Sequence, residues 1–288
     1  MAPRELIGRR RLDDGVDRWE MIDARPAAAL RSLVSHYAAY WEETRSFSAR
    51  QELATTRGVL IYALAEPVEI VGADGKAIVL GPGEGFAGGI SDKTSISRNL
   101  GVQAGVHVFL PLTSLAAVLG IPLAEVANRV ATMRDLIGPK ADELGGRLVD
   151  AVNAACRFDV LDDFLARRFA DRANHNDTIR WSMQRLARAS GPSCSALADE
   201  IGWSRRHFAR RFRYETGFSP DRFRRIARFE RFVAGLTGSP SEDLADLAIV
   251  NGYADQPHLA RDVRDFADTT PGDLRARLIP QGGGVRDD

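Results

Sequence analysis

Arginine side chains recur at helical spacing in two related segments of the chain. In the first segment, residues 197–220, the outward-facing stripe consists of Arg206, Ala209, Arg210 and Arg213, and Arg205 lies beside it. The major groove of B-DNA admits one α-helix, and the acceptor atoms of its base edges suit the donors of arginine. Arg206 and Arg210 are therefore expected to read bases. Arg205 and Arg213 are expected to contact phosphates.

The second segment, residues 247–271, repeats the first. Leu197, Ala198, Gly202 and Trp203 recur as Leu247, Ala248, Gly252 and Tyr253, and the match continues to Pro220 and Pro271. A repeat of this kind indicates two copies of one structural unit. In the second copy, Gln256, His258 and Arg261 occupy the positions expected to face DNA. A helical repeat with a purely structural role is the alternative interpretation.

Each copy has the sequence features of a helix-turn-helix. A glycine, Gly202 or Gly252, ends the first helix, because glycine adopts the left-handed conformation that a sharp turn needs. Ser204 or Asp255 then opens the second helix as its N-cap. The inward faces of the second helices are expected to carry Phe208 and Phe212 in one copy and Leu259 and Val263 in the other.

A helix over residues 221–236 is expected to join the two copies. At 1.5 Å per residue it would be about 24 Å long, which could hold two recognition helices roughly one DNA turn apart.

On these residues the chain resembles the AraC/XylS family of bacterial transcriptional regulators. The resemblance covers about residues 178–280, with LA-x-x-x-G-x-S and G-x-S-P in the first copy and LA-x-x-x-G-Y, H-L-x-R and T-P in the second. It implies an all-α domain of two helix-turn-helix units joined by a linker helix, in a regulator that usually activates transcription. It also implies DNA contacts from Arg206, Ala209, Arg210 and Arg213 in the first copy and from Gln256, His258 and Arg261 in the second. The sequence departs from the family pattern at Ala209, Arg211, Val263 and Asp268.

The preceding half of the chain is expected to form an α+β sensor or dimerisation domain. A helix is expected over 26–41, and β-strands over 59–64, 68–71, 78–80 and 106–109, separated by glycine-rich turns. Further helices are expected over 113–119, 123–130, 142–153 and 161–172. The β-rich stretch resembles the small cupin-like barrel or sandwich of the same family. The predicted organisation is a first domain over 1–172 (β-rich 51–110, helical 113–172), a linker over 173–178, the DNA-binding domain over 179–280 and a disordered tail over 281–288.

The charge of the chain is unevenly distributed, although its formal net charge is zero over 288 residues. Residues 178–238 contain 13 Arg and 5 acidic residues, a net charge of +8. Residues 239–288 contain 5 Arg and 10 acidic residues, a net charge of −5. The basic segment suggests a polyanionic partner, with a solvated helix face as the alternative.

The sequence offers little support for catalysis or for a cofactor. Its two cysteines form no metal-ligand cluster, and His107 is expected to be a packed histidine rather than a metal ligand. The glycines of 81–85 are expected to form a hairpin turn and not a phosphate loop. The first residues lack the apolar stretch of a signal peptide, and no run of about 18 apolar residues occurs, so a cytoplasmic protein without membrane contact is expected.

The sequence thus predicts a DNA-binding regulator that is not an enzyme, and leaves three alternatives open for its first domain. That domain could bind a small-molecule effector, could serve only for dimerisation, or could be a cupin-type enzyme fused to a DNA-binding module. The expected partners are double-stranded DNA, RNA polymerase if the protein activates, an effector and a second copy of the chain.

Overall fold

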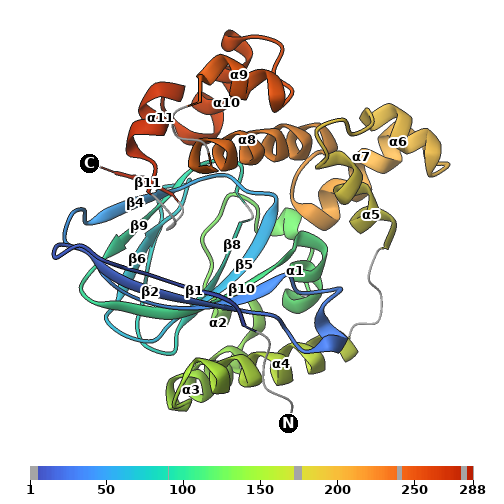
Figure 1. The fold of residues 1–288 in the computed structure, drawn as a ribbon. Coiled ribbons are helices and arrows are strands. Elements are labelled where there is room, and N and C mark those ends of the chain that lie inside the picture. Colours follow the sequence, from blue (N-terminus) through green and yellow to red (C-terminus); the bar gives the residue numbers. More distant parts are fainter. Residues whose placement is uncertain (1–5, 90, 172–176, 239–241, 280–283, 288) are drawn as a thin grey trace.

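A computed structural model describes residues 6–89, 91–171, 177–238, 242–279 and 284–287. A β-barrel built from two sheets occupies the first part of the chain, and a layer of helices from the second part lies across one end of it (Figure 1). No helix in the described parts of the chain is long and apolar enough to cross a membrane.

The two sheets of the barrel are antiparallel. The larger sheet contains, in spatial order, β1 (Leu6–Asp13), β2 (Arg18–Ala24), β3 (His36–Glu43), β10 (Gln103–Pro111), β5 (Arg57–Ala63) and β8 (Gly85–Gly88). The smaller sheet contains β11 (Val285–Arg286), β4 (Ala49–Glu52), β9 (Ser95–Asn99), β6 (Val68–Val71) and β7 (Ala77–Leu80). The strands expected over 59–64, 68–71, 78–80 and 106–109 are confirmed, and strands already begin at Leu6.

The helix expected over 26–41 is wrong. The chain there forms a short 3-10 turn, η1 (Ala28–Leu30), and then the central strand β3. Three consecutive residues of β3, Tyr37, Ala38 and Ala39, are buried, because helices cover one face of the strand and the barrel covers the other. A strand buried on both faces loses the alternating pattern, so its apolar residues resemble a helical stripe.

Helices pack on the outer face of the larger sheet. They are α1 (Leu112–Leu119), α2 (Met133–Ile137), α3 (Pro139–Asp150) and α4 (Ala154–Ala170). Tyr37 stacks on Phe158 of α4 and donates a hydrogen bond of 2.8 Å to Asp162. The helix expected over 123–130 is wrong, since only a 3-10 turn, η2 (Leu123–Glu125), forms there. The other expected helices of this region are present with shifted ends.

In the second part, the described residues form seven helices. They are α5 (Asp177–Leu186), α6 (Cys194–Glu200), α7 (Arg205–Thr216), α8 (Pro220–Gly238), α9 (Leu244–Val250), α10 (Gln256–Ala267) and α11 (Pro271–Arg277). The long helix α8 lies across the end of the barrel, with α5–α7 towards one of its ends and α9–α11 towards the other (Figure 1). This is the predicted pair of helix-turn-helix units with a linker helix. Of the predicted linker, residues 173–176 lie outside the described residues, and the last two belong to α5.

The barrel and the helical part share one continuous hydrophobic core. The recognition helix α7 lies against α1 and η2, and buried residues such as Leu115 and Phe212 belong to the same cluster. The two parts are therefore packed against each other through apolar side chains as well as linked by the chain.

The end of the chain returns to the barrel. Val285 is fully buried, and β11 pairs antiparallel with β4 through Val285–Gln51 and Arg286–Arg50. Gly284, at a φ of +78°, makes the turn into this strand. The expectation of a disordered tail over 281–288 is thus wrong for residues 284–287, while 281–283 and 288 lie outside the described residues.

Candidate nucleic-acid interface

The turn of the first helix-turn-helix unit has the predicted geometry. Gly202 has a φ of +72°, and the backbone N–H of Trp203 donates to the carbonyl of Ala198 at 2.9 Å. Ser204 caps α7, because its hydroxyl accepts the backbone N–H of His207 at 3.2 Å. The sequence thus fixes both the end of α6 and the start of the recognition helix α7.

The second unit repeats this geometry closely. Gly252 has a φ of +83°, and the N–H of Tyr253 donates to the carbonyl of Ala248 at 2.9 Å. Asp255 caps α10, since its carboxylate accepts the N–H of His258 at 2.7 Å. The two copies therefore share the backbone hydrogen bonds of the turn as well as their sequence pattern.

The predicted base-reading and phosphate-contacting arginines of α7 lie on its surface. Arg205, Arg206, Arg210 and Arg213 are exposed, and Ala209 between them is half-buried. On the opposite face Phe208 and Phe212 are buried, with ring centroids 5.6 Å apart. Among the described residues no carboxylate pairs with these four arginines, so their donors are available to a ligand of negative charge.

The corresponding residues of α10 are less basic. Gln256 and Arg261 are exposed, and His258 is half-buried beside Tyr253, with ring centroids 5.3 Å apart. Burial, followed by the nearby positive charge of Arg228, lowers the pKa of His258 and favours its neutral form. Its Nδ1 accepts the N–H of Ala254 at 3.4 Å, which leaves Nε2–H as a donor.

The arginines of α8 have a different role from those of α7. Arg225 donates to Asp262 at 2.8 Å, and Arg228 donates to the other oxygen of Asp262 at 2.7 Å. Asp262 is 1% exposed and lies on the inward face of α10. The carboxylate of Asp262 thus offsets part of the positive charge of α8, whereas the four arginines of α7 keep theirs exposed.

These ion pairs were not apparent from composition, but the sequence contains a signal for Asp262. It stands at helical spacing between Leu259, Val263 and Phe266, all of which face the core. A carboxylate on the buried face of a helix needs a cationic partner. Helix α8 supplies two, Arg225 and Arg228.

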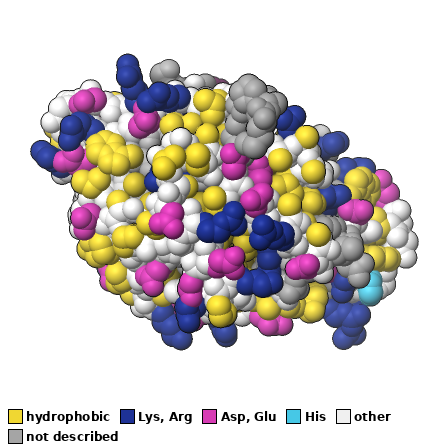
Figure 2. Space-filling model, turned by 90° about the horizontal axis from the view of Figure 1, so that it is seen from below, with side chains coloured by type: hydrophobic (Ala, Val, Ile, Leu, Met, Phe, Trp, Pro, Cys, Tyr) yellow, Lys and Arg dark blue, Asp and Glu magenta, His cyan; other side chains and the backbone are white. Residues whose placement is uncertain are grey.

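Charge on the face seen from below Figure 1 is mixed. The face that carries α3 and α4 shows small groups of Lys and Arg interspersed with Asp and Glu (Figure 2). No wide area of this face therefore carries charge of a single sign. The exposed stripe of α7 therefore fits a polyanion better than this face does.

The interior of the barrel is a second candidate site. On β10, Val106 and Val108 are buried beneath the helices, whereas His107 and Phe109 on the inner face are only half-buried. His107 lies against Tyr40, with ring centroids 4.8 Å apart, and burial lowers the pKa of His107 to about 3. Its imidazole is therefore neutral and serves as a donor and an acceptor at once.

Charged side chains cross the interior of the barrel from the smaller sheet to the larger one. Arg50 on β4 donates to Glu42 on β3 at 3.1 Å, and within the smaller sheet Ser97 on β9 donates to Glu52 on β4 at 3.0 Å. In the described residues no group of three His, Cys, Asp or Glu lies close enough to hold a metal ion.

Comparison with known proteins supports the assignment of the C-terminal region. Residues 197–277 match the family model described as "Helix-turn-helix domain". Uncharacterised HTH-type transcriptional regulators from Staphylococcus aureus strains MSSA476 and MRSA252 are each 30% identical over 83 residues, which is 29% of this chain and 11% of the relative. The chain thus spans about a tenth of the length of these relatives.

Two solved structures are similar at low sequence identity. ToxT from Vibrio cholerae is 9% identical, with a TM-score of 0.47 over 83% of this chain and 98% of that one. The C-terminal domain of AraT from Geobacillus stearothermophilus is 16% identical, with a TM-score of 0.32 over 37% of this chain and 87% of that one. The family match at residues 197–277 coincides with the two repeated units, so this C-terminal region contains a helix-turn-helix domain.

Proposed function

We propose that the protein is a sequence-specific, double-stranded-DNA-binding transcriptional regulator. The observation that carries the proposal is the pair of capped helix-turn-helix units, of which the first presents arginines that are exposed and unpaired with carboxylates. Four such guanidinium groups on one helix match the acceptor pattern of a major groove and its flanking phosphates.

The two units have unequal roles in this proposal. Arg206 and Arg210 of α7 read base edges, and Arg205 and Arg213 contact phosphates; Ala209 contacts a thymine methyl. Gln256, His258 and Arg261 of α10 extend the contact into the next groove with fewer charges. Activation through contact with RNA polymerase, and action as a homodimer, complete the proposal by analogy with the family.

Arg210→Ala is expected to weaken binding to the specific DNA site by about 1–3 kcal/mol and to relax the preference at one base position. The cause is the loss of a bidentate donor to one base, while the exposed position on α7 leaves the fold intact. A binding titration against the site and against its single-base variants measures both effects. Unchanged affinity together with unchanged preference would rule out base reading by Arg210.

Arg213→Ala is the matched control for this experiment. It also removes an exposed arginine side chain from α7, but at a position that is proposed to contact a phosphate. It is expected to weaken binding to all sequences alike and to reduce the salt dependence of log K by about one unit. If Arg213→Ala instead changed the preference at one base position only, Arg213 would be the base-reading residue and its phosphate role would be wrong.

We further propose that the barrel interior binds a small-molecule effector. Support comes from the polar groups that Tyr40 and His107 place inside the barrel, where their ring centroids lie 4.8 Å apart. Arg50 and Glu42 offer charged partners nearby. A molecule with both hydroxyl groups and an apolar face fits this set of donors, acceptors and rings.

Native mass spectrometry of the full chain incubated with a cell extract is expected to reveal a bound small molecule. The double variant Tyr40→Phe, His107→Leu is expected to lose it, because both changes remove hydrogen-bonding atoms and preserve apolar volume. A ligand retained at the same occupancy would place it elsewhere. A wild-type protein that captures nothing would favour the alternative in which the first domain only dimerises.

A further inference from the structure

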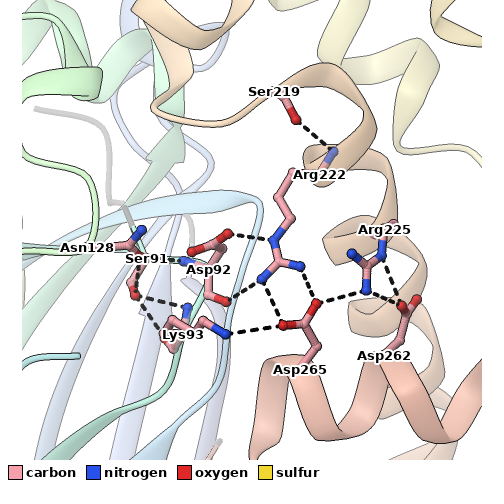
Figure 3. A network of polar contacts seen from close by, with 9 residues as sticks. All are labelled: Ser91, Asp92, Lys93, Asn128, Ser219, Arg222, Arg225, Asp262 and Asp265. Carbon is pink, nitrogen blue, oxygen red and sulfur yellow. Dashed lines mark hydrogen bonds and ion pairs between the residues drawn. The ribbon is translucent and has the colours of Figure 1, made fainter. Parts of the chain in front are cut away.

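The loop between β8 and β9 holds the DNA-binding half through a cluster of ion pairs (Figure 3). The Nε of Arg222 donates to the carboxylate of Asp92 at 2.5 Å, and its Nη2 donates to the backbone carbonyl of Asp92 at 3.1 Å. The same guanidinium also pairs with Asp265 of α10. Lys93, next to Asp92, lies 3.2 Å from Asp265. We call Asp92, Lys93, Arg222 and Asp265 the clasp.

Three of the four side chains of the clasp are largely shielded from water, whereas that of Lys93 is 56% exposed. The side chains of Arg222, Asp92 and Asp265 are 17%, 19% and 27% exposed, so their mutual attraction is screened less than that of a surface pair. The guanidinium of Arg222 lies over the ring of Phe266 at 4.3 Å, which fixes its plane. The hydrogen bond from Arg222 also holds the pKa of Asp265 below its ordinary value.

The loop that carries Asp92 is itself held in place. The side-chain oxygen of Asn128 accepts the N–H of Asp92 at 3.0 Å and the hydroxyl of Ser91 at 2.9 Å. Asn128 has a φ of +60°, a conformation that asparagine adopts more readily than most residues. It follows η2 in the chain, and η2 lies against α7. One region of the barrel domain therefore contacts α7 and supports the loop that reaches α10.

The clasp does not cover the surface proposed to face DNA. Gln256 and Arg261 of α10 remain exposed, and Asp265 lies to the side of their stripe. A second contact, in which Thr55 and Thr56 donate to Glu230, joins α8 to the barrel further along the helix. The arrangement restrains α10 in position without blocking it.

We propose that Asp92, Lys93 and Arg222 are positioning residues that fix α10 relative to α7, and so set the distance between the two DNA half-sites that the protein accepts. The apolar contact of α7 with α1 and η2 anchors one recognition helix to the barrel domain, and the clasp anchors the other. This inference rests on the proposed DNA binding for its functional consequence, but the restraint itself belongs to the free protein.

The test compares the wild-type chain with the double variant Asp92→Asn, Lys93→Gln. Both changes are near-isosteric and remove the charges that the loop presents to Arg222 and Asp265. Glu69→Gln is the matched control, because it breaks the pair of Glu69 with Arg98 on the barrel surface, away from the helices. Hydrogen exchange of the free proteins is measured first, by mass spectrometry of peptides from α7 and α10.

The double variant is expected to exchange the amides of α10 several-fold faster, with those of α7 unchanged. The control is expected to behave as wild type. Unchanged exchange of α10 in the double variant would overturn the clasp as a restraint, whatever the protein binds.

The second measurement uses duplexes selected from a random pool on the wild-type chain, with one base pair inserted or deleted between the two half-sites. One base pair turns a half-site by about 35°, so the wild type is expected to lose about tenfold or more in affinity and the double variant clearly less. Equal losses in both proteins would overturn the positioning role. Failure to select any bipartite sequence would count against the proposed function, and the exchange experiment would then judge the clasp on its own.

Discussion

Asp262→Ala is expected to lower the free energy of unfolding by about 3 kcal/mol or more, although Asp262 lies on the inward face of α10 and outside the stripe proposed to face DNA. Its carboxylate is 1% exposed and receives hydrogen bonds from Arg225 and from Arg228. Without it, Arg228, whose side chain is 17% exposed, keeps its charge in a mostly buried place without a counter-ion. Arg225 still pairs with Asp265, which limits the loss.

Urea denaturation followed by the fluorescence of Trp181 and Trp203 measures this effect in the helical part. Asp246→Ala on the exposed face of α9 is the control and is expected to change the free energy of unfolding by less than about 0.5 kcal/mol. A result for Asp262→Ala close to that of the control would show that the α8–α10 contact depends on its apolar residues alone.

Phe212→Ala is expected to cost about 3–5 kcal/mol of folding stability and to abolish DNA binding at physiological temperature. Phe212 is fully buried and packs edge-on against Phe208, at 5.6 Å, and against Phe223 of α8, at 5.4 Å. Its removal leaves a cavity where the recognition helix, the linker helix and the barrel-facing core meet.

Two further variants separate packing from helix propensity in this prediction. Phe212→Leu keeps much of the volume and is expected to cost clearly less than the alanine change. Tyr214→Ala on the same helix removes a side chain that is 48% exposed and is expected to have little effect. If Phe212→Ala and Tyr214→Ala were equally mild, α7 would not be held by this aromatic cluster.

Repeated local chemistry made the helical part predictable. Each unit needs a glycine at positive φ, a capping side chain and two apolar residues four positions apart. All of these residues lie close together in the sequence, so a local pattern reveals them. The barrel domain lacked such signals. In β1 the run Arg9–Arg11 gives no apolar alternation, and β3 is buried on both faces, so neither strand stood out.

Contacts between distant segments could not be predicted from local patterns. Asp92 and Arg222 meet across a separation of 130 residues, and neither has an unusual neighbourhood in the sequence. The charge totals of residues 178–238 and 239–288 contained a hint of mutual attraction, because they have opposite signs. Only the placement of α10 beside α8 turns that hint into the pairs of Asp262 and Asp265 with arginine.

The strand β11 gives the helical half a second attachment to the barrel, through backbone pairing with β4. A body tethered at one point can swivel in any direction, but one tethered at two points can only rotate about the line that joins them. The helices α5–α11 are attached through the start of α5 and again where Val285 enters the smaller sheet. Detachment of β11 from β4 would therefore remove one restraint on the helical half, beside the apolar contact of α7 with α1 and η2 and the clasp.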